Sequence, residues 1–167
     1  MIDTVTRYLN QMHDQRDLAN LRPMIEGIAD ALSCQSMERA AIAASTGATT
    51  CKIGATDWYG IAQGKLQKVA AATVLPALSG TIAQNTFNVY CFYIDSAGTI
   101  TSQMGTAGAT KDLIKFPVRP VGKTLIGAAM FNPTAGAFVG GTTNADAANT
   151  NIVGLNTMGA FDPTFLL

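Results

Sequence analysis

Apolar residues recur at helical spacing in the first part of the chain. Intervals of three and four residues mark one face of an α-helix, and they separate Ile2, Val5, Leu9 and Met12. Proline is tolerated in a first helical turn, so Pro23 is suited to open a second helix running to about Ala44. The apolar face of that second helix would be formed by Met24, Ile28 and Leu32, with Cys34 or Gln35.

From residue 47 onward the pattern is that of short strands. The strongest candidate is "TFNVYCFYI" at 86–94, which is dense in aromatic and β-branched residues. "DSAG" follows, with Gly98 suited to the left-handed position after a type I turn, and "TITSQMG" returns as the second arm of a hairpin. Further strands are predicted in 51–64, 65–76, 123–131, 135–143 (as the partner of 123–131) and 150–156.

The glycine distribution divides the chain at the same place. Of the 16 glycines, one lies in residues 1–46 and the rest lie in 47–167. No crossover helices are visible among the predicted strands, which favours an antiparallel architecture. We therefore expect a mainly β protein, in which a helical arm of one or two helices (residues 1–46) precedes a β-sandwich or jelly-roll-like domain (residues 47–167).

The first arm of the hairpin is apolar on both of its faces. Alternation along a strand directs one set of side chains into the sandwich core, namely Phe87, Val89, Cys91 and Tyr93. The opposite set is Tyr90, Phe92 and Ile94. These three must be covered by the N-terminal helices, by a neighbouring subunit, or by both. We favour a subunit interface.

Composition supports a component of an assembly. The 167 residues carry 11 basic and 11 acidic side chains, so the formal net charge is zero, and phosphate neutralisation of nucleic acid is not expected. Charged residues make up 13%, about half the usual share of a soluble domain. The N-terminus has no apolar signal region, and no run of about 18 apolar residues predicts a membrane span. The three cysteines are expected to be reduced and buried after synthesis in a cytoplasm.

Residues that could perform chemistry are sparse. His13 is the only histidine and lies in the helical arm beside Asp14 and Asp17, where we expect it to face solvent. The sequence "PVGKT" at 120–124 ends like a phosphate-binding loop, but the required glycine is replaced by Pro117 and a strand follows. We expect a simple turn there, and we expect no catalytic residue, no cofactor and no metal site.

Two further clusters have alternative interpretations. Asp57, Trp58 and Tyr59 combine a carboxylate with stacking aromatics, as a glycan site would, although the aromatic pair would equally serve as core or interface. The C-terminal region, whose only charges after Thr124 are Asp146 and Asp162, ends in apolar residues that would contact a neighbouring subunit or fold back over their own domain: Phe161, Phe165, Leu166 and Leu167.

Three segments together resemble a known class of proteins. "VYCFYIDSAGTITSQMGT", "FPVRPVGKTLIGAAMF" and "FVGGTTNADAANTNIVGLN" occur in this order, within about residues 86–157. This succession is similar to that of small virion structural proteins of tailed bacteriophages, which are described as head decoration, cement or fibre-like proteins. The resemblance implies a β-sandwich that binds a capsid or tail lattice as a homo-oligomer, without catalysis.

The sequence thus predicts a non-enzymatic capsid decoration or cement protein on the virion surface. Its partners would be further copies of itself, with a trimer slightly favoured over a dimer, and the lattice of the major capsid protein. A tail, neck or head-fibre subunit is the alternative within the structural class. A carbohydrate-binding β-sandwich that uses Asp57, Trp58 and Tyr59 is the alternative from another class.

Overall fold

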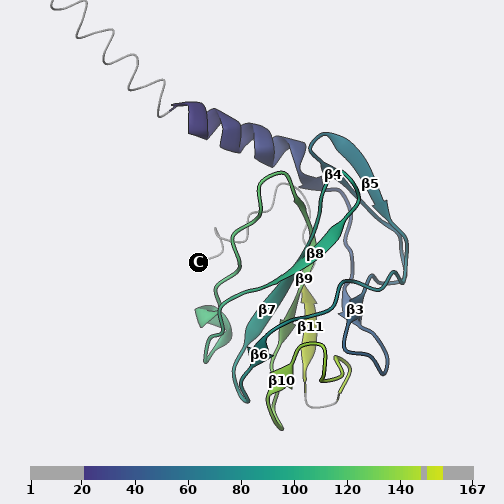
Figure 1. Cartoon of the computed structure of the whole chain (residues 1–167), viewed down its shortest axis with the longest axis vertical. Coiled ribbons are helices and arrows are strands. Elements are labelled where there is room, and N and C mark those ends of the chain that lie inside the picture. The colour runs from purple at the N-terminus through teal and green to yellow at the C-terminus, as the bar shows by residue number, and fades with distance from the viewer. Residues whose placement is uncertain (1–20, 148–149, 156–167) are drawn as a thin grey trace, which may run out of the picture.

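The computed structural model describes residues 21–147 and 150–155, and the fold over these residues is mainly β, as predicted, with one helix and open sheets. The largest sheet has four antiparallel strands in the order β11-β9-β7-β8. These are β7 (Asn88–Ile94), β8 (Ile100–Met104), β9 (Thr124–Phe131) and β11 (Ile152–Leu155). Figure 1 shows this central sheet in the middle of the molecule.

The predicted hairpin is confirmed as β7 and β8. The Asp95 carboxylate accepts hydrogen bonds from the backbone N–H groups of Ala97 (3.0 Å) and Thr99 (2.9 Å). These bonds, the Thr99 one above all, hold the pKa of Asp95 below its ordinary value. Gly98 has φ of 83°, the left-handed conformation that the turn requires. Turn chemistry alone was therefore enough to locate the hairpin.

Both faces of β7 are covered by the chain itself. Tyr90, Phe92 and Ile94 are at most 1% exposed and belong to the larger core cluster. Assigning these three residues to a subunit interface was therefore wrong. Distant segments supply the cover: Phe138 stands edge-on to Tyr90 at 6.3 Å, and its ring centroid lies 4.8 Å from that of Phe131.

Smaller sheets provide the rest of this cover. One has the order β1-β4-β5, formed by β1 (Gln35–Ser36), β4 (Trp58–Ala62) and β5 (Lys65–Val69). Two others pair β2 (Ala43–Ala44) with β3 (Cys51–Lys52) and β6 (Thr81–Ile82) with β10 (Phe138–Val139). The predicted pairing of 135–143 with 123–131 is wrong, because β7 and β11 already occupy the two edges of β9.

The opposite face of the central sheet is covered by the long segment between β8 and β9, which contains the short 3-10 helix η1 (Lys111–Leu113). Ile114 and Phe116 from this segment pack on Val89, Cys91 and other side chains of that face. Thr106 forms a β-bridge with Lys115 and closes the segment on itself. A second, smaller core results.

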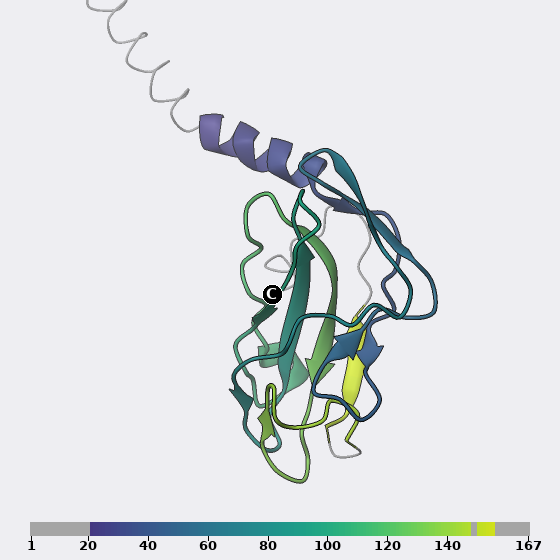
Figure 2. The same ribbon diagram turned by 45° about the vertical axis from the view of Figure 1, so that its right-hand side comes forward.

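Residues 21–33 form the helix, which we call the N-terminal helix. It lies at one end of the β-body, and its residue-21 end points away from that body (Figures 1 and 2). The helix predicted to continue to Ala44 ends at 33 instead. Residues 34–44 contribute β1, β2 and three buried apolar side chains, Cys34, Ala40 and Ile42, on the N-terminal side of the expected boundary at 46. Strand pairing and burial override the helical propensity of this alanine-rich segment.

Candidate interaction surface

The N-terminal helix carries a row of exposed apolar side chains. Four of them follow at intervals of four, three and four residues and form what we call the helix stripe: Leu21, Ile25, Ile28 and Leu32. Their side chains are between 46% and 63% exposed, and the neighbouring Met24 is 63% exposed. At about 100° per residue the four positions fall within an arc of about 60°. The helix therefore presents a continuous apolar ridge to its surroundings.

An ion pair fixes the orientation of this ridge. Arg119, on the segment before β9, pairs with the carboxylate of Asp30, and both side chains are largely buried, at 12% and 17% exposed. The same carboxylate accepts a hydrogen bond from the backbone N–H of Gly122 (2.8 Å), while Arg119 donates to the carbonyl of Lys123 (2.9 Å). Asp30 lies about 180° around the helix from Leu21. Asp30 thus faces the β-body near the end of the helix, and the helix stripe lies on the opposite side.

The "PVGKT" segment is the turn that the sequence predicts. The backbone N–H of Lys123 donates to the carbonyl of Pro120 (3.2 Å), and β9 begins at Thr124. Gly122 has φ of 75°. Its N–H binds the helix carboxylate, and the Lys123 ammonium donates to the Thr101 hydroxyl (3.1 Å). One donor of this turn, the N–H of Gly122, therefore contacts the helix, and the Lys123 donors bind within the turn and on β8.

The aromatic cluster at 57–59 is structural. Trp58 is fully buried, and its indole N–H donates to the hydroxyl of Ser36 (2.9 Å). A glycan contact by Trp58 is therefore wrong, because no face of its ring is available for stacking. Asp57 accepts from the ammonium of Lys68 (2.7 Å) and from the N–H of Ala71 (2.8 Å). The Lys68 bond, as the larger cause, holds the pKa of Asp57 below its ordinary value.

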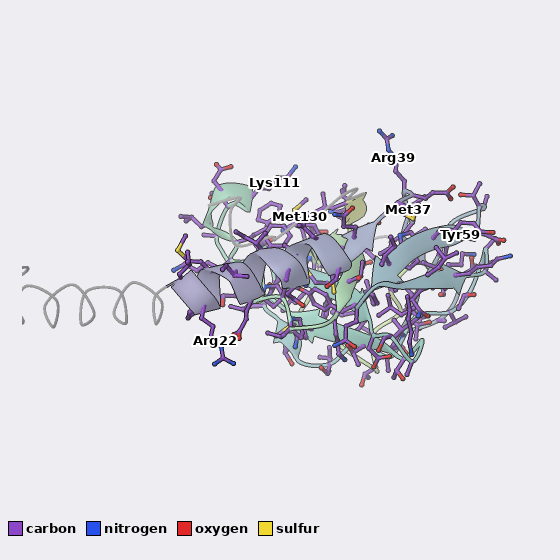
Figure 3. All side chains as sticks on the ribbon, turned by 90° about the horizontal axis from the view of Figure 1, so that it is seen from above. Arg22, Met37, Arg39, Tyr59, Lys111 and Met130 are labelled. Atoms are coloured by element: carbon purple, nitrogen blue, oxygen red, sulfur yellow. The ribbon has the colours of Figure 1, made fainter. Side chains whose placement is uncertain are left out.

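Tyr59 is the half-buried member of this cluster. The Lys68 ammonium lies 5.6 Å from its ring centroid, so the exposed face of the ring is shared with a cation of the next strand. Viewed from above, Tyr59 lies at the opposite end of the molecule from Arg22 on the N-terminal helix (Figure 3). The cluster and the helix stripe are separate surfaces.

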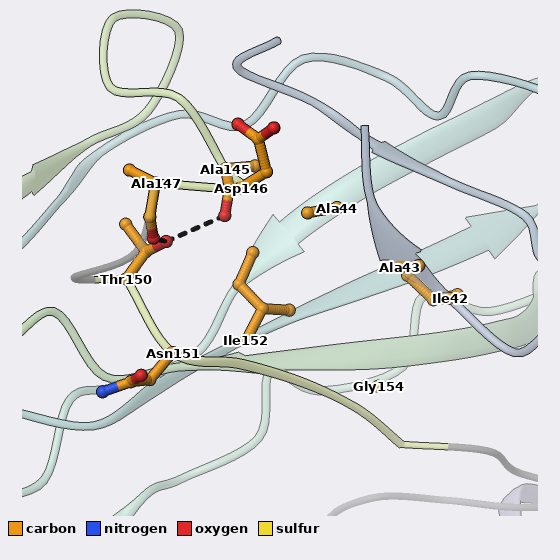
Figure 4. Close-up of a pocket in the computed structure, with 10 residues that line it drawn as sticks. All are labelled: Ile42, Ala43, Ala44, Ala145, Asp146, Ala147, Thr150, Asn151, Ile152 and Gly154. Carbon is orange, nitrogen blue, oxygen red and sulfur yellow. Dashed lines mark hydrogen bonds between the residues drawn. The ribbon is translucent and has the colours of Figure 1, made fainter. Parts of the chain in front are cut away.

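A cavity of about 320 Å³ lies where β2 approaches β11 (Figure 4). Its walls are mostly small apolar side chains such as Ala43 and Ala44, together with Ile152. The one carboxylate, that of Asp146, accepts a hydrogen bond from the backbone N–H of Gly47 (2.6 Å). The Thr150 hydroxyl donates to the carbonyls of Ala145 and Ala147. These polar groups therefore form hydrogen bonds with the backbone of the surrounding loops.

The three cysteines are unpaired and buried, and their burial confirms the prediction. Burial raises the pKa of the Cys51 thiol and of the Cys91 thiol to about 12 each. Cys34 accepts a weak hydrogen bond from the backbone N–H of Gln63 (3.4 Å). All three behave as small core side chains.

Several predicted contact residues lie outside the described residues. They are Ile2, Val5, Leu9, Met12, Phe161, Phe165, Leu166 and Leu167. His13, which was expected to face solvent, also lies outside the described residues. Among the described residues, no group of three or more histidine, cysteine, aspartate or glutamate side chains could hold a metal ion. No helix in that part of the chain combines the length and apolar character needed to cross a membrane.

Sequence reasoning found Met24, Ile28 and Leu32 on the helix but missed Leu21 and Ile25. The repeated spacing of four and three residues was the signal that would have included both. These apolar side chains are exposed in the structure. The chain matches no protein-family model, and neither the curated proteins nor the solved structures yield a significant match.

Proposed function

We propose that this chain is a non-enzymatic virion structural protein of a tailed bacteriophage, a decoration or cement protein that binds and stabilises the head as a homo-oligomer. The observation that carries the proposal is the helix stripe, exposed on a helix whose opposite face Asp30 anchors to the β-body. An exposed apolar ridge promotes aggregation of an isolated chain, whereas in an assembly it is buried against a neighbouring subunit.

Composition and resemblance support the same role. A charge share of 13% gives a poorly solvated surface, which suits a subunit with much of its surface against neighbours. The segments within about 86–157 resemble those of phage decoration, cement and fibre-like proteins. The partners in this proposal are other copies of the chain and the major capsid protein lattice, on the capsid surface, after synthesis in the host cytoplasm.

The fold that we propose for the β region is a β-sandwich of jelly-roll type. The larger core cluster supports it, because Phe92 and Phe131 of the central sheet meet Trp58 of β4 within one apolar layer. Two β layers with a shared core between them are the basis of that architecture.

The second candidate is a tail, neck or head-fibre subunit. The direction of the N-terminal helix favours it, since the residue-21 end points away from the β-body (Figure 2). A helix of this kind suits a stalk that holds the body at a distance from its attachment point. The carbohydrate-binding hypothesis is not retained, because its stacking residue Trp58 is buried.

Quantitative mass spectrometry of virions purified from the phage that encodes the chain tests this proposal. We expect the chain at a fixed, high copy number relative to the major capsid protein, in emptied heads as well as in intact virions. A replication protein of the same phage serves as the carry-over control. Detection of the chain only at the level of that control would overturn the proposed function.

A further inference from the structure

We propose that residues 115–121 form a polyproline II segment that docks into an aromatic-lined groove of a different protein. The segment follows η1 and runs toward the end of the molecule that carries the N-terminal helix (Figure 1). The inference goes beyond the proposed virion role and does not depend on it. The observations behind it are a three-residue repeat of exposure, two prolines and the two most exposed large apolar side chains of the described residues.

Exposure along this segment repeats every three residues. Lys115, Val118 and Val121 are exposed, whereas the two residues between each of them and the next are half-buried. A polyproline II helix has three residues per turn, so residues three apart lie in one row along it. The repeat differs from the alternation of a strand and from the longer period of an α-helix. The three exposed residues therefore form one row, which we call the outward row.

The sequence restricts the backbone to the same conformation. The proline ring fixes φ at about −65° at Pro117 and Pro120, and the residue before each proline is restricted to the extended and polyproline II region. Gly122 has φ of 75°, and the N–H of Lys123 donates to the carbonyl of Pro120 (3.2 Å). These are the features of a type II turn, whose second residue, here Val121, has angles close to those of polyproline II. The conformation therefore ends at the glycine.

The other two rows attach the segment to the body. Phe116 packs against the second, smaller core, and the Arg119 guanidinium pairs with Asp30 of the N-terminal helix. In the remaining row, the carbonyl of Pro117 accepts a hydrogen bond from the Tyr93 hydroxyl (3.4 Å). The outward row is thus held in one conformation before a partner binds, so little conformational entropy is lost on docking.

The outward row indicates the chemistry of the partner. Val118 and Val121 are 75% and 86% exposed, and at about 3.1 Å per residue they lie roughly 9 Å apart. Polyproline II segments are recognised by grooves lined with aromatic side chains. The exposed Lys115 at the start of the row has no ion-pair partner among the described residues. The groove that fits is aromatic and carries a carboxylate at the end that meets Lys115.

NMR titration of the full-length chain, followed through its valine methyl groups, tests the inference. The probes are an SH3, a WW and an EVH1 domain, which all bind polyproline II segments in an aromatic groove. We expect at least one to bind saturably and to shift the methyl resonances of Val118 and Val121. Binding should be at least tenfold weaker for Val118→Asp/Val121→Asp, whose fold is checked by near-UV circular dichroism. The matched control, Leu66→Asp/Val74→Asp, changes two exposed apolar residues elsewhere and should bind like the wild type.

A second variant tests the conformation of the segment. Pro117→Ala/Pro120→Ala keeps both valines but frees the two fixed φ angles, so we expect several-fold weaker binding with the fold intact. Equal binding by this variant would show that an apolar patch is recognised without polyproline II geometry, and it would overturn the inference.

Two further results would also count against the inference. One is the absence of binding by all three domains. The other is the same methyl shifts on concentrating the chain alone, because they would assign the outward row to contacts between copies. Virion mass spectrometry tests the proposed function separately, so the two can fail independently.

Discussion

Asp30 of the N-terminal helix and Arg119 of the segment before β9 form an ion pair across 89 positions of the sequence. The pair joins the helix to the β-body, and the backbone N–H of Gly122 adds a second contact to the same carboxylate. The hydrogen bond from the backbone N–H of Gly64 to the carbonyl of Ser33 (3.0 Å) also holds the end of the helix to the β-body. The helix stripe lies on the side of the helix opposite this contact, and residues 21–29 are all exposed.

Loss of the carboxylate should destabilise the folded chain. In Asp30→Ala the Arg119 guanidinium stays largely buried without its counter-charge, and we expect a loss of about 2 kcal/mol in the free energy of unfolding. Urea denaturation followed by circular dichroism measures it. Arg22→Ala is the control, since it removes an exposed ion pair and should cost at most about 0.5 kcal/mol. Equal losses in both variants would contradict the anchoring role.

The fluorescence of Trp58 should be that of a buried indole. It is the only tryptophan, is fully buried, and donates to Ser36. We expect blue-shifted emission that acrylamide hardly quenches in the native chain and that soluble oligosaccharides leave unchanged. Denaturation should red-shift the emission and restore quenching. Strong quenching in the native state would show that the ring is accessible and would return it to consideration as a stacking surface.

Two glycine-to-alanine substitutions should have opposite effects. A Cβ at Gly105 would lie 2.4 Å from the carbonyl oxygen of Lys115 and 2.9 Å from the Val89 side chain, where the long segment closes over the central sheet. We expect Gly105→Ala to cost about 2 kcal/mol. Gly27 lies in the helix with no atom within 4 Å of the added Cβ, so Gly27→Ala should gain up to about 1 kcal/mol.

Thermal denaturation of the two variants measures these changes. A destabilised Gly27→Ala chain would indicate that the exposed side of the helix is already in contact with a partner at that position. A neutral Gly105→Ala chain would contradict the tight closure of the segment over β7.

Stability should fall in alkaline solution. Burial raises the pKa of Cys51 from 9.0, and that of Tyr90 from 10.0, to about 12 in each case. Between these values the folded chain retains protons that the unfolded chain has released, so the contribution of both groups is complete below pH 9 and is lost as the pH rises toward 12. The urea concentration at the unfolding midpoint should decrease from pH 8 upward. In a Cys51→Ala chain, the decrease relative to that chain's own value at pH 8 should be smaller. A flat profile would contradict the burial of these groups.

The sequence was sufficient where structure is set locally. Asp95 and Gly98 define the hairpin turn through contacts within five residues, and the strand character of 86–94 follows from its own side chains. It was not sufficient where distant segments decide. The helix ends at 33 because β1 pairs with β4, as Gln35 does with Ile61, and no local signal announces that pairing.

The candidate site shows the same division. The spacing of Leu21, Ile25, Ile28 and Leu32 defines the helix stripe, whereas the contact of Asp30 with the β-body involves a partner 89 residues away. The interface assigned to Tyr90, Phe92 and Ile94 was wrong for a related reason. A strand that is apolar on both faces must be buried on both faces. Its own sequence does not indicate whether a second chain or a distant part of the same chain covers it.

Reconstitution on phage heads tests the central claim most directly. Purified full-length chain is mixed with phage heads that lack it, taken from the phage that the proposal assigns to it, and bound protein is recovered by pelleting through a sucrose cushion. The proposed role predicts saturable binding at a fixed ratio to the major capsid protein, together with heads that withstand heating better. A chain that stays in the supernatant at every concentration, with its fold intact, would contradict the account.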